Sequence, residues 1–321
     1  MLRIHFTDAD LGGVRLAPGA DPLWEALLSQ HQVTGGGPPV LRSWRRRTRS
    51  RLTPPMRTLL RLAPPTGYSP DFLTPTAGVR DIEASLEAVR RTSLDLVHAD
   101  LGWMQAHRPP PGWVRKLADG DAAAMRGLTE AMREYFDAAL AAVWPSVCGH
   151  VAAERAIRAR AMADGGVRRL LATLHPAVRW EPPVLRVAYP EDRDLHLGGR
   201  GLVLLPSYFC WRTPVTLRAA DRPPVLVYPI DHSADRHHGA TPGNLTALVG
   251  ATRAAVLRAA LRHPHGCTTG DLARYAGISL SSASEHATVL RQAGLLRARP
   301  LGRHVLHVIT ELGRRLAGGG D

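Results

Sequence analysis

The spacing of hydrophobic positions changes along this chain, and each spacing predicts a different kind of element. Over residues 2–7 apolar and polar side chains alternate, which predicts a strand. Asp21 and Pro22 then form a helix start, and apolar residues follow at helical spacing over residues 23–28. We therefore expect an amphipathic helix that the Gly/Pro-rich residues 35–39 end.

Helical spacing dominates the middle of the chain, and strand-like spacing returns after it. Residues 79–105 and 113–175 carry apolar side chains with a helical period. These helices precede short apolar runs, separated by Gly and Pro, at residues 184–189, 202–205, 215–217 and 225–228. The runs predict a small sheet, so the expected fold class is α+β, with a mainly helical N-terminal domain.

Arginines gather between residues 42 and 61 with no acidic residue among them. Trp44 and other apolar residues interleave with them, and Pro54-Pro55 interrupts the stretch. One interpretation is a patch that binds nucleic acid or phosphate. The other, which we favour, is a basic helix face in solvent whose apolar side packs on the core. The arginines are Arg42, Arg45, Arg46, Arg47, Arg49, Arg51, Arg57 and Arg61.

Two further segments have the composition of loops. Residues 64–76 contain four prolines among large apolar or aromatic residues, which predicts a rigid segment docked by packing, or one that lines a pocket. Residues 236–244 hold almost no apolar side chain, which predicts a linker. The linker separates an uncharacterised N-terminal sensor or dimerisation domain, residues 1–235, from a C-terminal domain, residues 245–321.

The C-terminal domain is predicted to open with two helices. The first covers residues 245–261, and Asn244 is suited to be its N-cap. The second begins at Thr268 or Thr269 and ends at Gly277, a residue type that favours helix ends. A tight turn follows, which is typical of a helix-turn-helix.

A third helix and a hairpin complete the predicted winged helix-turn-helix. The helix runs from Ser279, its N-cap, to Gly294. The hairpin pairs residues 295–299 with 303–309, and a short helix over 310–317 ends the domain. The side chains expected to face the core from the third helix are Ala283, Ala287 and Leu290.

This arrangement predicts a DNA-binding surface. The third helix of such a domain enters the major groove, and a basic hairpin beside it grips neighbouring phosphates or the minor groove. Small serine side chains allow close approach and hydrogen-bond to bases or phosphates. The predicted DNA contacts are Ser279, Ser281, Ser282, Ser284, Glu285, His286, Arg291, Arg297, Arg299, Arg303 and His304.

The charge of the chain agrees with a polyanionic partner. The net charge is +13 at pH 7. Residues 245–321 contain 10 arginines and 4 acidic residues, whereas the preceding residues contain 31 basic and 24 acidic ones. The C-terminal domain is therefore the more densely positive part, as binding to double-stranded DNA requires.

The predicted third helix and hairpin resemble a known family. Residues 278–296, with Ser284, His286 and the run Ala293-Gly294-Leu295, resemble the recognition helix of ArsR-type winged-helix regulators. Gly302-Arg303 and residues 305–310 resemble the wing of that family. The resemblance covers about 70 residues and implies a DNA-binding regulator.

The N-terminal part resembles the uncharacterised domain that precedes the DNA-binding domain of some actinobacterial regulators of this type. The similar pieces include residues 21–25, 67–73 and 205–214, together with the opening strand. This resemblance implies an architecture and supplies no ligand.

Two departures from the ArsR-type pattern bear on function. Glu285 stands where the family often carries Arg; its carboxylate repels phosphate but accepts a hydrogen bond from cytosine N4. Metal-sensing members carry a Cys-x-Cys pair at the start of the second helix, where this chain has Cys267 alone. His263 and His265 precede that cysteine, but no fourth ligand is evident, so we expect no metal.

Other functional classes find little support in the residues. The three cysteines form no CxxC pair, which predicts a reducing cytoplasm. No apolar stretch approaches the ~20 residues that span a bilayer, and no secretory leader is evident. No phosphate-binding loop or catalytic constellation stands out, so we expect no cofactor.

The sequence therefore predicts a sequence-specific transcription regulator. We expect a repressor that binds double-stranded DNA as a homodimer, is not triggered by metal and has no membrane partner. An unknown small molecule bound by the N-terminal domain is the candidate signal. The alternative is an N-terminal enzyme domain that carries a DNA-targeting winged-helix tail.

Overall fold

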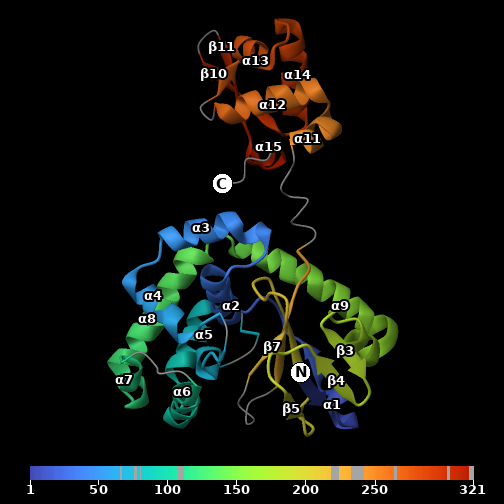
Figure 1. The fold of residues 1–321 in the computed structure, drawn as a ribbon. Coiled ribbons are helices and arrows are strands. Elements are labelled where there is room, and N and C mark those ends of the chain that lie inside the picture. Colours follow the sequence, from blue (N-terminus) through green and yellow to red (C-terminus); the bar gives the residue numbers. More distant parts are fainter. Residues whose placement is uncertain are drawn as a thin grey trace. The chain divides into compact units, whose positions relative to one another are not determined.

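The computed structural model describes residues 1–317 except 66, 76–77, 80, 108–111, 218–223, 233–241, 264–265 and 302–303. The chain divides into two compact units, Met1–His232 and Ser233–Asp321 (Figure 1). The fold is α+β, as predicted.

One sheet of the N-terminal unit has the strand order β3-β4-β1-β5. Strand β1 (Leu2–His5) pairs antiparallel with β4 (Val184–Val187) and parallel with β5 (Arg193–His196). Strand β3 (Val178–Glu181) pairs with β4 at the edge. The predicted alternation of β1 is confirmed, because its residues are alternately buried and half-buried.

A second sheet has the order β2-β6-β8-β7. Strands β2 (Val14–Leu16), β6 (Leu202–Ser207) and β8 (Val225–Pro229) are parallel, and β7 (Val215–Thr216) is antiparallel to β8. The prediction of one small sheet was therefore incomplete. Strands β1 and β2 join partners that lie far along the chain, and spacing carries no signal for such pairing.

The second sheet separates two hydrophobic cores. Its alternating residues Val203, Leu205, Val225 and Val227 face a core built with the helices. The residues between them face a second core, which the first sheet and the end of α9 complete. Those residues are Leu202, Leu204, Leu226 and Tyr228. Both faces are covered, which explains why β6 and β8 read as continuous apolar runs.

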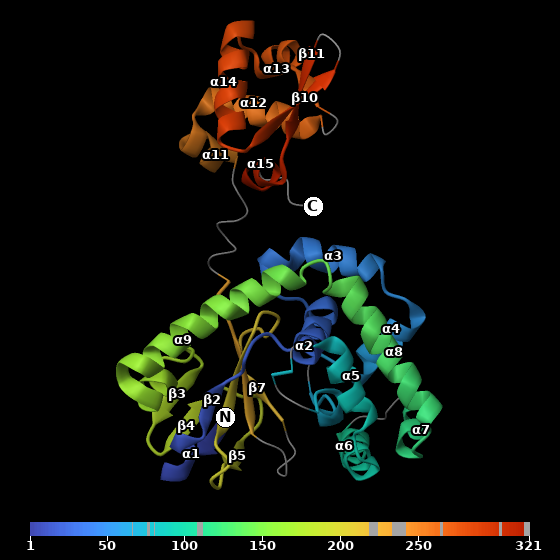
Figure 2. The same cartoon turned by 180° about the vertical axis from the view of Figure 1, so that it is seen from behind.

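Helices gather on one side of these sheets, while α9 passes over the strands (Figures 1 and 2). Helix α9 is interrupted at Gly165 and Gly166, whose backbone angles are not helical. The helices are α1 (Asp8–Gly12), α2 (Pro22–Gly35), α3 (Arg42–Ser50), α4 (Pro54–Leu62), α5 (Ile82–Arg90), α6 (Leu94–His107), α7 (Val114–Ala118), α8 (Ala122–Ala139) and α9 (Trp144–Ala172), with short turns η1 (Pro39–Leu41) and η2 (Asp71–Leu73).

In the part of the chain that the structure describes, no single helix has the length and apolar composition of a membrane span. Helices α8 and α9 meet that test only as a pair, and they are bent by 87° relative to each other.

Helix α2 differs from its prediction. Asp21 caps it as expected, accepting from the backbone N–H groups of Leu23 and Trp24. The helix is buried on nearly all sides, including polar Glu25 and Ser29, so it is a central helix and not an amphipathic surface helix. Its polar residues find partners across the core, and spacing alone does not reveal this.

The arginine-rich stretch forms α3 and α4, with its apolar side on the core. Trp44 and Thr48 of α3 are buried, and so are Met56 and Leu59 of α4. The break falls at the predicted prolines, because Pro54 starts α4 directly after its N-cap, Thr53. This agrees with the packing interpretation and leaves the role of the outward arginines open.

The C-terminal unit has a three-stranded sheet of order β10-β11-β9, and three of its five described helices pack against the sheet. Its core includes Leu257, Leu272, Leu290 and Ile309. The elements are α11 (Pro242–Val249), α12 (Ala251–Arg262), β9 (Cys267–Thr268), α13 (Thr269–Ala276), α14 (Leu280–Gln292), β10 (Leu296–Leu301), β11 (His304–Ile309) and α15 (Glu311–Leu316).

Three boundaries in this unit correct the sequence prediction. The single helix predicted over 245–261 is two helices, because Gly250 adopts φ 83° and interrupts them. Asn244 lies inside α11 and is not an N-cap, since Pro242 already suits the first helical position. Of the predicted linker 236–244, residues 236–241 lie outside the described part and the rest belong to α11.

The hairpin also differs in detail. Its strands extend to Leu301 and His304, which are paired in register, so Pro300 belongs to a strand and not to the loop. Pro300 lacks only a backbone N–H, and a proline is tolerated where a strand needs no donor.

Candidate nucleic-acid interface

Helix α13 begins with a reciprocal cap between Thr268 and Asp271. The Thr268 hydroxyl donates to Asp271 Oδ2 at 2.7 Å, and the Asp271 backbone N–H donates to Thr268 Oγ1 at 3.2 Å. The Thr268 backbone N–H also donates to Asp271 Oδ2, at 3.1 Å, and the two hydrogen bonds that this carboxylate accepts from Thr268 lower the pKa of Asp271. The predicted helix start is confirmed and is fixed by purely local contacts.

The turn between α13 and α14 has the conformation that the sequence predicted. Gly277 ends α13 in the left-handed region at φ 67°, where glycine is favoured. Ser279 then caps α14 by accepting from the backbone N–H of Ser282 at 3.2 Å. Ala283, Ala287 and Leu290 are buried, which confirms the inward stripe of the third helix.

The opposite side of α14 is polar. Ser281, Ser284 and Glu285 are exposed, and Ser282 and His286 are half-buried. A surface of small polar side chains backed by a buried stripe is the form that fits a major groove.

The capping serines are already engaged with one another. Ser279 Oγ lies 3.0 Å from Ser281 Oγ and 2.9 Å from Ser282 Oγ. A base or phosphate contact by Ser279 or Ser282 therefore competes with the cap. Ser284 and Glu285 lie further along the helix and take no part in that cap.

Exposed arginines lie beside this helix. Arg297 and Arg299 occupy alternate positions of β10, so they share one face of the strand, and Arg291 is exposed near the end of α14. Arg303 lies outside the residues that the structure describes. His304 begins β11.

Three exposed residues near this surface were missed by sequence reasoning. Leu280 starts α14 and is 60% exposed, and Tyr275 on α13 is 45% exposed. The guanidinium of Arg274 lies 4.8 Å from the centre of the Tyr275 ring. The signal was present, because the helical period places Arg274 opposite buried Leu272.

The residues considered as metal ligands have other contacts. The His263 ring stacks on Tyr275 at 4.4 Å between centroids. Cys267 is buried in β9, and burial raises the pKa of its thiol. His265 lies outside the described residues. Within the described ranges no three His, Cys, Asp or Glu side chains cluster as a metal site would require.

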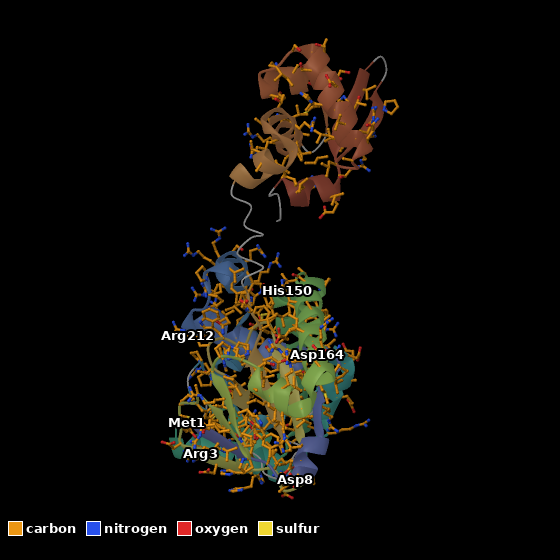
Figure 3. All side chains as sticks on the ribbon, turned by 90° about the vertical axis from the view of Figure 1, so that its right-hand side faces the viewer. Met1, Arg3, Asp8, His150, Asp164 and Arg212 are labelled. Atoms are coloured by element: carbon orange, nitrogen blue, oxygen red, sulfur yellow. The ribbon has the colours of Figure 1, made fainter. Side chains whose placement is uncertain are left out.

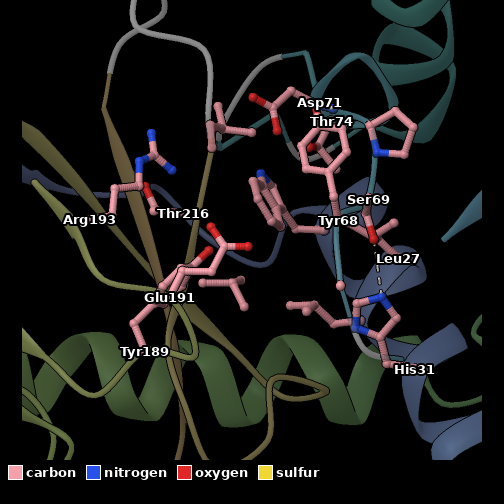
Figure 4. A pocket seen from close by; sticks show the side chains of 16 residues that line it. Leu27, His31, Tyr68, Ser69, Asp71, Thr74, Tyr189, Glu191, Arg193 and Thr216 are labelled. Atoms are coloured by element: carbon pink, nitrogen blue, oxygen red, sulfur yellow. Dashed lines mark hydrogen bonds between the residues drawn. The ribbon is translucent and has the colours of Figure 1, made fainter. Parts of the chain in front are cut away.

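The N-terminal unit contains a pocket between α2, residues 67–74 and the strand edges (Figure 4). The hollow has about 630 Å³ of empty space and is partly open to solvent. Arg193 and Thr216 face it from the strands, opposite Asp71 and Thr74. Its apolar lining includes Trp24, Leu27, Leu28, Val215 and Leu217. The segment predicted to dock, or to line a pocket, does both.

Two groups in this lining bear on what it can hold. Burial lowers the pKa of His31 to about 4, so its imidazole is neutral near pH 7. Ser69 Oγ lies 3.4 Å from His31 Nε2. The indole N–H of Trp24 is buried and makes no hydrogen bond to any described residue. A buried donor without a partner is costly, so an acceptor beside it would be favoured.

Comparison with known proteins identifies the class of the C-terminal unit. Residues 248–304 match the model of the MarR family. This stretch holds the helix-turn-helix and most of the hairpin, so the unit is a winged helix-turn-helix domain, and the match points to a DNA-binding transcription regulator. The match does not extend to the N-terminal unit. No curated protein and no solved structure matches the chain.

Proposed function

We propose that this protein is a sequence-specific transcription regulator that binds double-stranded DNA through α14 and the β10–β11 wing. The observation that carries the proposal is the polar outward side of α14 beside exposed Arg297 and Arg299, within the stretch that matches the MarR family. The ArsR-type resemblance of residues 278–296 supports the same assignment, because both families use a winged helix.

In this proposal the two elements have different tasks. Ser284 and Glu285 contact base edges in the major groove, where a carboxylate accepts from cytosine N4. Arg297 and Arg299 bind phosphates, which fixes the position of the domain without reading sequence. Arg291, His286, Arg303 and His304 complete the proposed contact set.

We further propose that the regulator acts as a homodimeric repressor. One winged helix covers one half-site, and two copies related by a two-fold axis fit a palindromic operator. Leu248 on α11 and Leu312 on α15 are 69% and 58% exposed, and a second copy would remove such apolar surface from water. No metal trigger is proposed.

Selection of duplexes from a random-sequence pool by the full chain tests DNA binding. We expect a two-fold symmetric consensus and a logarithmic salt slope of about −0.9 for each phosphate contacted. Sedimentation of the complex gives the number of copies bound. Failure to enrich any sequence, with binding that is insensitive to salt, would contradict the proposal. Added Zn²⁺ should leave the affinity for the selected duplex unchanged.

The N-terminal unit is proposed to sense a small uncharged molecule in the pocket of Figure 4. The apolar part of its wall, neutral His31 and the Trp24 N–H, which has no partner among the described residues, favour an apolar body with one hydrogen-bond acceptor. Coumarin, which has a carbonyl acceptor, and naphthalene, which lacks one, are matched probes of similar size. We expect coumarin to shift the Trp24 indole proton resonance and to bind about tenfold more tightly than naphthalene.

Two variants sharpen this test. Ser69→Phe fills the pocket and should abolish the Trp24 shift, whereas Ser146→Phe should not. Ser146 is a matched control because it also lies beside a histidine, 3.5 Å from His150 Nδ1, but is exposed on α9, away from the pocket lining. A shift confined to Trp113, whose indole N–H is also buried without a described partner, would contradict the assignment.

A further inference from the structure

The outward side of α3 is a row of arginines without acidic partners. Arg42, Arg46 and Arg47 are exposed on this helix, and Arg51 is exposed directly after it. None of the four makes an ion pair with any residue in the described ranges of the chain. The segment 42–61 itself contains no acidic residue.

Exposed arginines elsewhere in the same unit are of two kinds. Some, such as Arg168 and Arg212 (Figure 3), make no ion pair with the described residues, and others have carboxylate partners. Arg91 lies 2.8 Å from Glu87, Arg160 lies 3.7 Å from Asp164, and Arg179 lies 3.8 Å from Glu181. The α3 row differs from these in its density, because several exposed arginines lie within residues 42–51 and that stretch holds no acidic residue. The positive charge there is uncompensated, and it creates a local field that attracts an anion.

Helix α3 is held firmly behind this row. Trp44 and Thr48 are 5% and 2% exposed, and the Trp44 indole N–H donates to the carbonyl of Ala139 at 2.7 Å. Arg49 is exposed as well, but its guanidinium is engaged, because Nε donates to the carbonyl of Val33 at 2.8 Å. The remaining arginines are thus presented on a rigid scaffold at the surface of the unit, as Figures 1 and 2 show for α3.

The composition of the row favours one class of partner. The other exposed residues of α3 are Ser43, Arg49 and Ser50, so the helix presents no exposed apolar side chain that would enter a bilayer. Arginine binds phosphate through paired N–H groups. A regular polyanion such as the DNA backbone satisfies several such groups at once.

We propose that the α3 arginine row, Arg42, Arg46, Arg47 and Arg51, is a second DNA-binding surface that contacts backbone phosphates flanking the sequence held by the winged helix. The inference rests on the proposed function, because it requires that the winged helix binds DNA. It adds a contact to backbone phosphates that does not depend on the base sequence. It predicts that duplex outside the operator contributes to affinity and to salt dependence.

The test measures how tightly the full chain binds two duplexes of different length, at several salt concentrations. One is the shortest selected duplex that retains binding, and the other extends it by about two helical turns, about 21 bp, on each side. The variant Arg42→Ala/Arg46→Ala/Arg47→Ala should keep its fold, because these side chains are exposed and alanine favours helices. We expect the wild type to show a steeper salt slope on the long duplex, and the variant to lose about 0.9 of that slope per contact.

A control variant removes the same charge elsewhere. Arg91→Ala/Arg160→Ala/Arg179→Ala should leave the slope on both duplexes unchanged. The inference is overturned if the α3 variant keeps the wild-type slope on the long duplex, or if the control variant loses as much. It is also overturned if the α3 variant binds both duplexes like the wild type but no longer binds vesicles of phosphatidylcholine and phosphatidylserine in equal parts. Absence of binding to either duplex by the wild type contradicts the proposed function instead.

Discussion

The carboxylate of Glu25 on α2 accepts a hydrogen bond from the hydroxyl of Ser207, at the end of β6, over 2.9 Å. The backbone N–H groups of Tyr208 and Phe209 also donate to it, at 2.8 and 3.0 Å. Glu25 is fully buried, and burial raises its pKa to about 7 in spite of these three donors. One carboxylate therefore connects the central helix α2 to the residues directly after β6.

This contact predicts a pH-dependent stability. Because the pKa of folded Glu25 is raised from 4.5 to about 7, its stabilising contribution is complete below about pH 4.5 and is lost as the pH rises through 7. Glu25→Gln should remove that loss. Urea unfolding of the N-terminal unit, followed by tryptophan fluorescence, should show the wild type weakening relative to the variant across this range.

His31 titrates in the opposite sense and is present in both proteins. Its lowered pKa gives stability that is present above pH 6.5 and is lost as the pH falls through about 4. Burial also raises the pKa of Asp21, to about 6, and its charge interacts with Glu25. The difference between wild type and variant therefore reports Glu25 together with its interaction with Asp21. Parallel stability curves for the two proteins would contradict the assigned pKa.

Gly201 should be far less tolerant of substitution than its neighbour Gly199. Both have positive φ, at 69° and 86°, so alanine strains either position by about 1–2 kcal/mol. A Cβ on Gly201 would also lie 2.3 Å from the carbonyl oxygen of Gly13, whereas one on Gly199 meets no atom within 4 Å.

Unfolding of Gly201→Ala and Gly199→Ala by urea measures the contrast. We expect Gly201→Ala to lose several times more of the free energy of unfolding, because Gly13 offers rigid backbone and not a movable side chain. The backbone N–H of Gly201 also donates to the carboxylate of buried Asp10, at 3.0 Å. Equal losses for both variants would show that the close approach to Gly13 does not exist.

The cap of α13 should matter for the winged helix. Thr268→Ala removes the acceptor for the Asp271 N–H, and we expect the C-terminal unit to lose about 1 kcal/mol of unfolding free energy. Hydrogen exchange of the α13 amides locates the effect. Thr288→Ala is a control, since that hydroxyl bonds to the carbonyl of Ser284 within α14 and caps nothing. A larger loss in the control would mean that the cap contributes little.

Wing and helix substitutions should separate affinity from specificity. Replacing Arg297 and Arg299 by alanine should weaken binding to all duplexes alike and reduce the salt slope by about 0.9 per contact. Glu285→Ala should instead change the preferred base at one position of the selected duplex. Repeating the selection with each variant measures both effects, and the reverse pattern would show that the roles are misassigned.

Local signals in the sequence were sufficient for the helix starts and for the inward side of α14. Asp21, Thr268 and Ser279 cap helices by bonding to backbone groups two or three residues away, so the evidence lies within one turn. The helical period likewise placed Ala283 and Leu290 in the core. Sequence reasoning was less successful at Gly250, where a single φ value decides whether one helix or two form.

Long-range contacts were decided only by the tertiary structure. Spacing showed that β1 is a strand but not that it joins β4 and β5, because pairing depends on chain segments about 180 residues away. It predicted α2 as amphipathic because the donors that satisfy Glu25 come from the end of β6. The arginines of α3 were visible in the sequence, but the structure alone separated Arg49, which bonds to the Val33 carbonyl, from the unpaired row, since only packing against Val33 and Ala139 orients the helix.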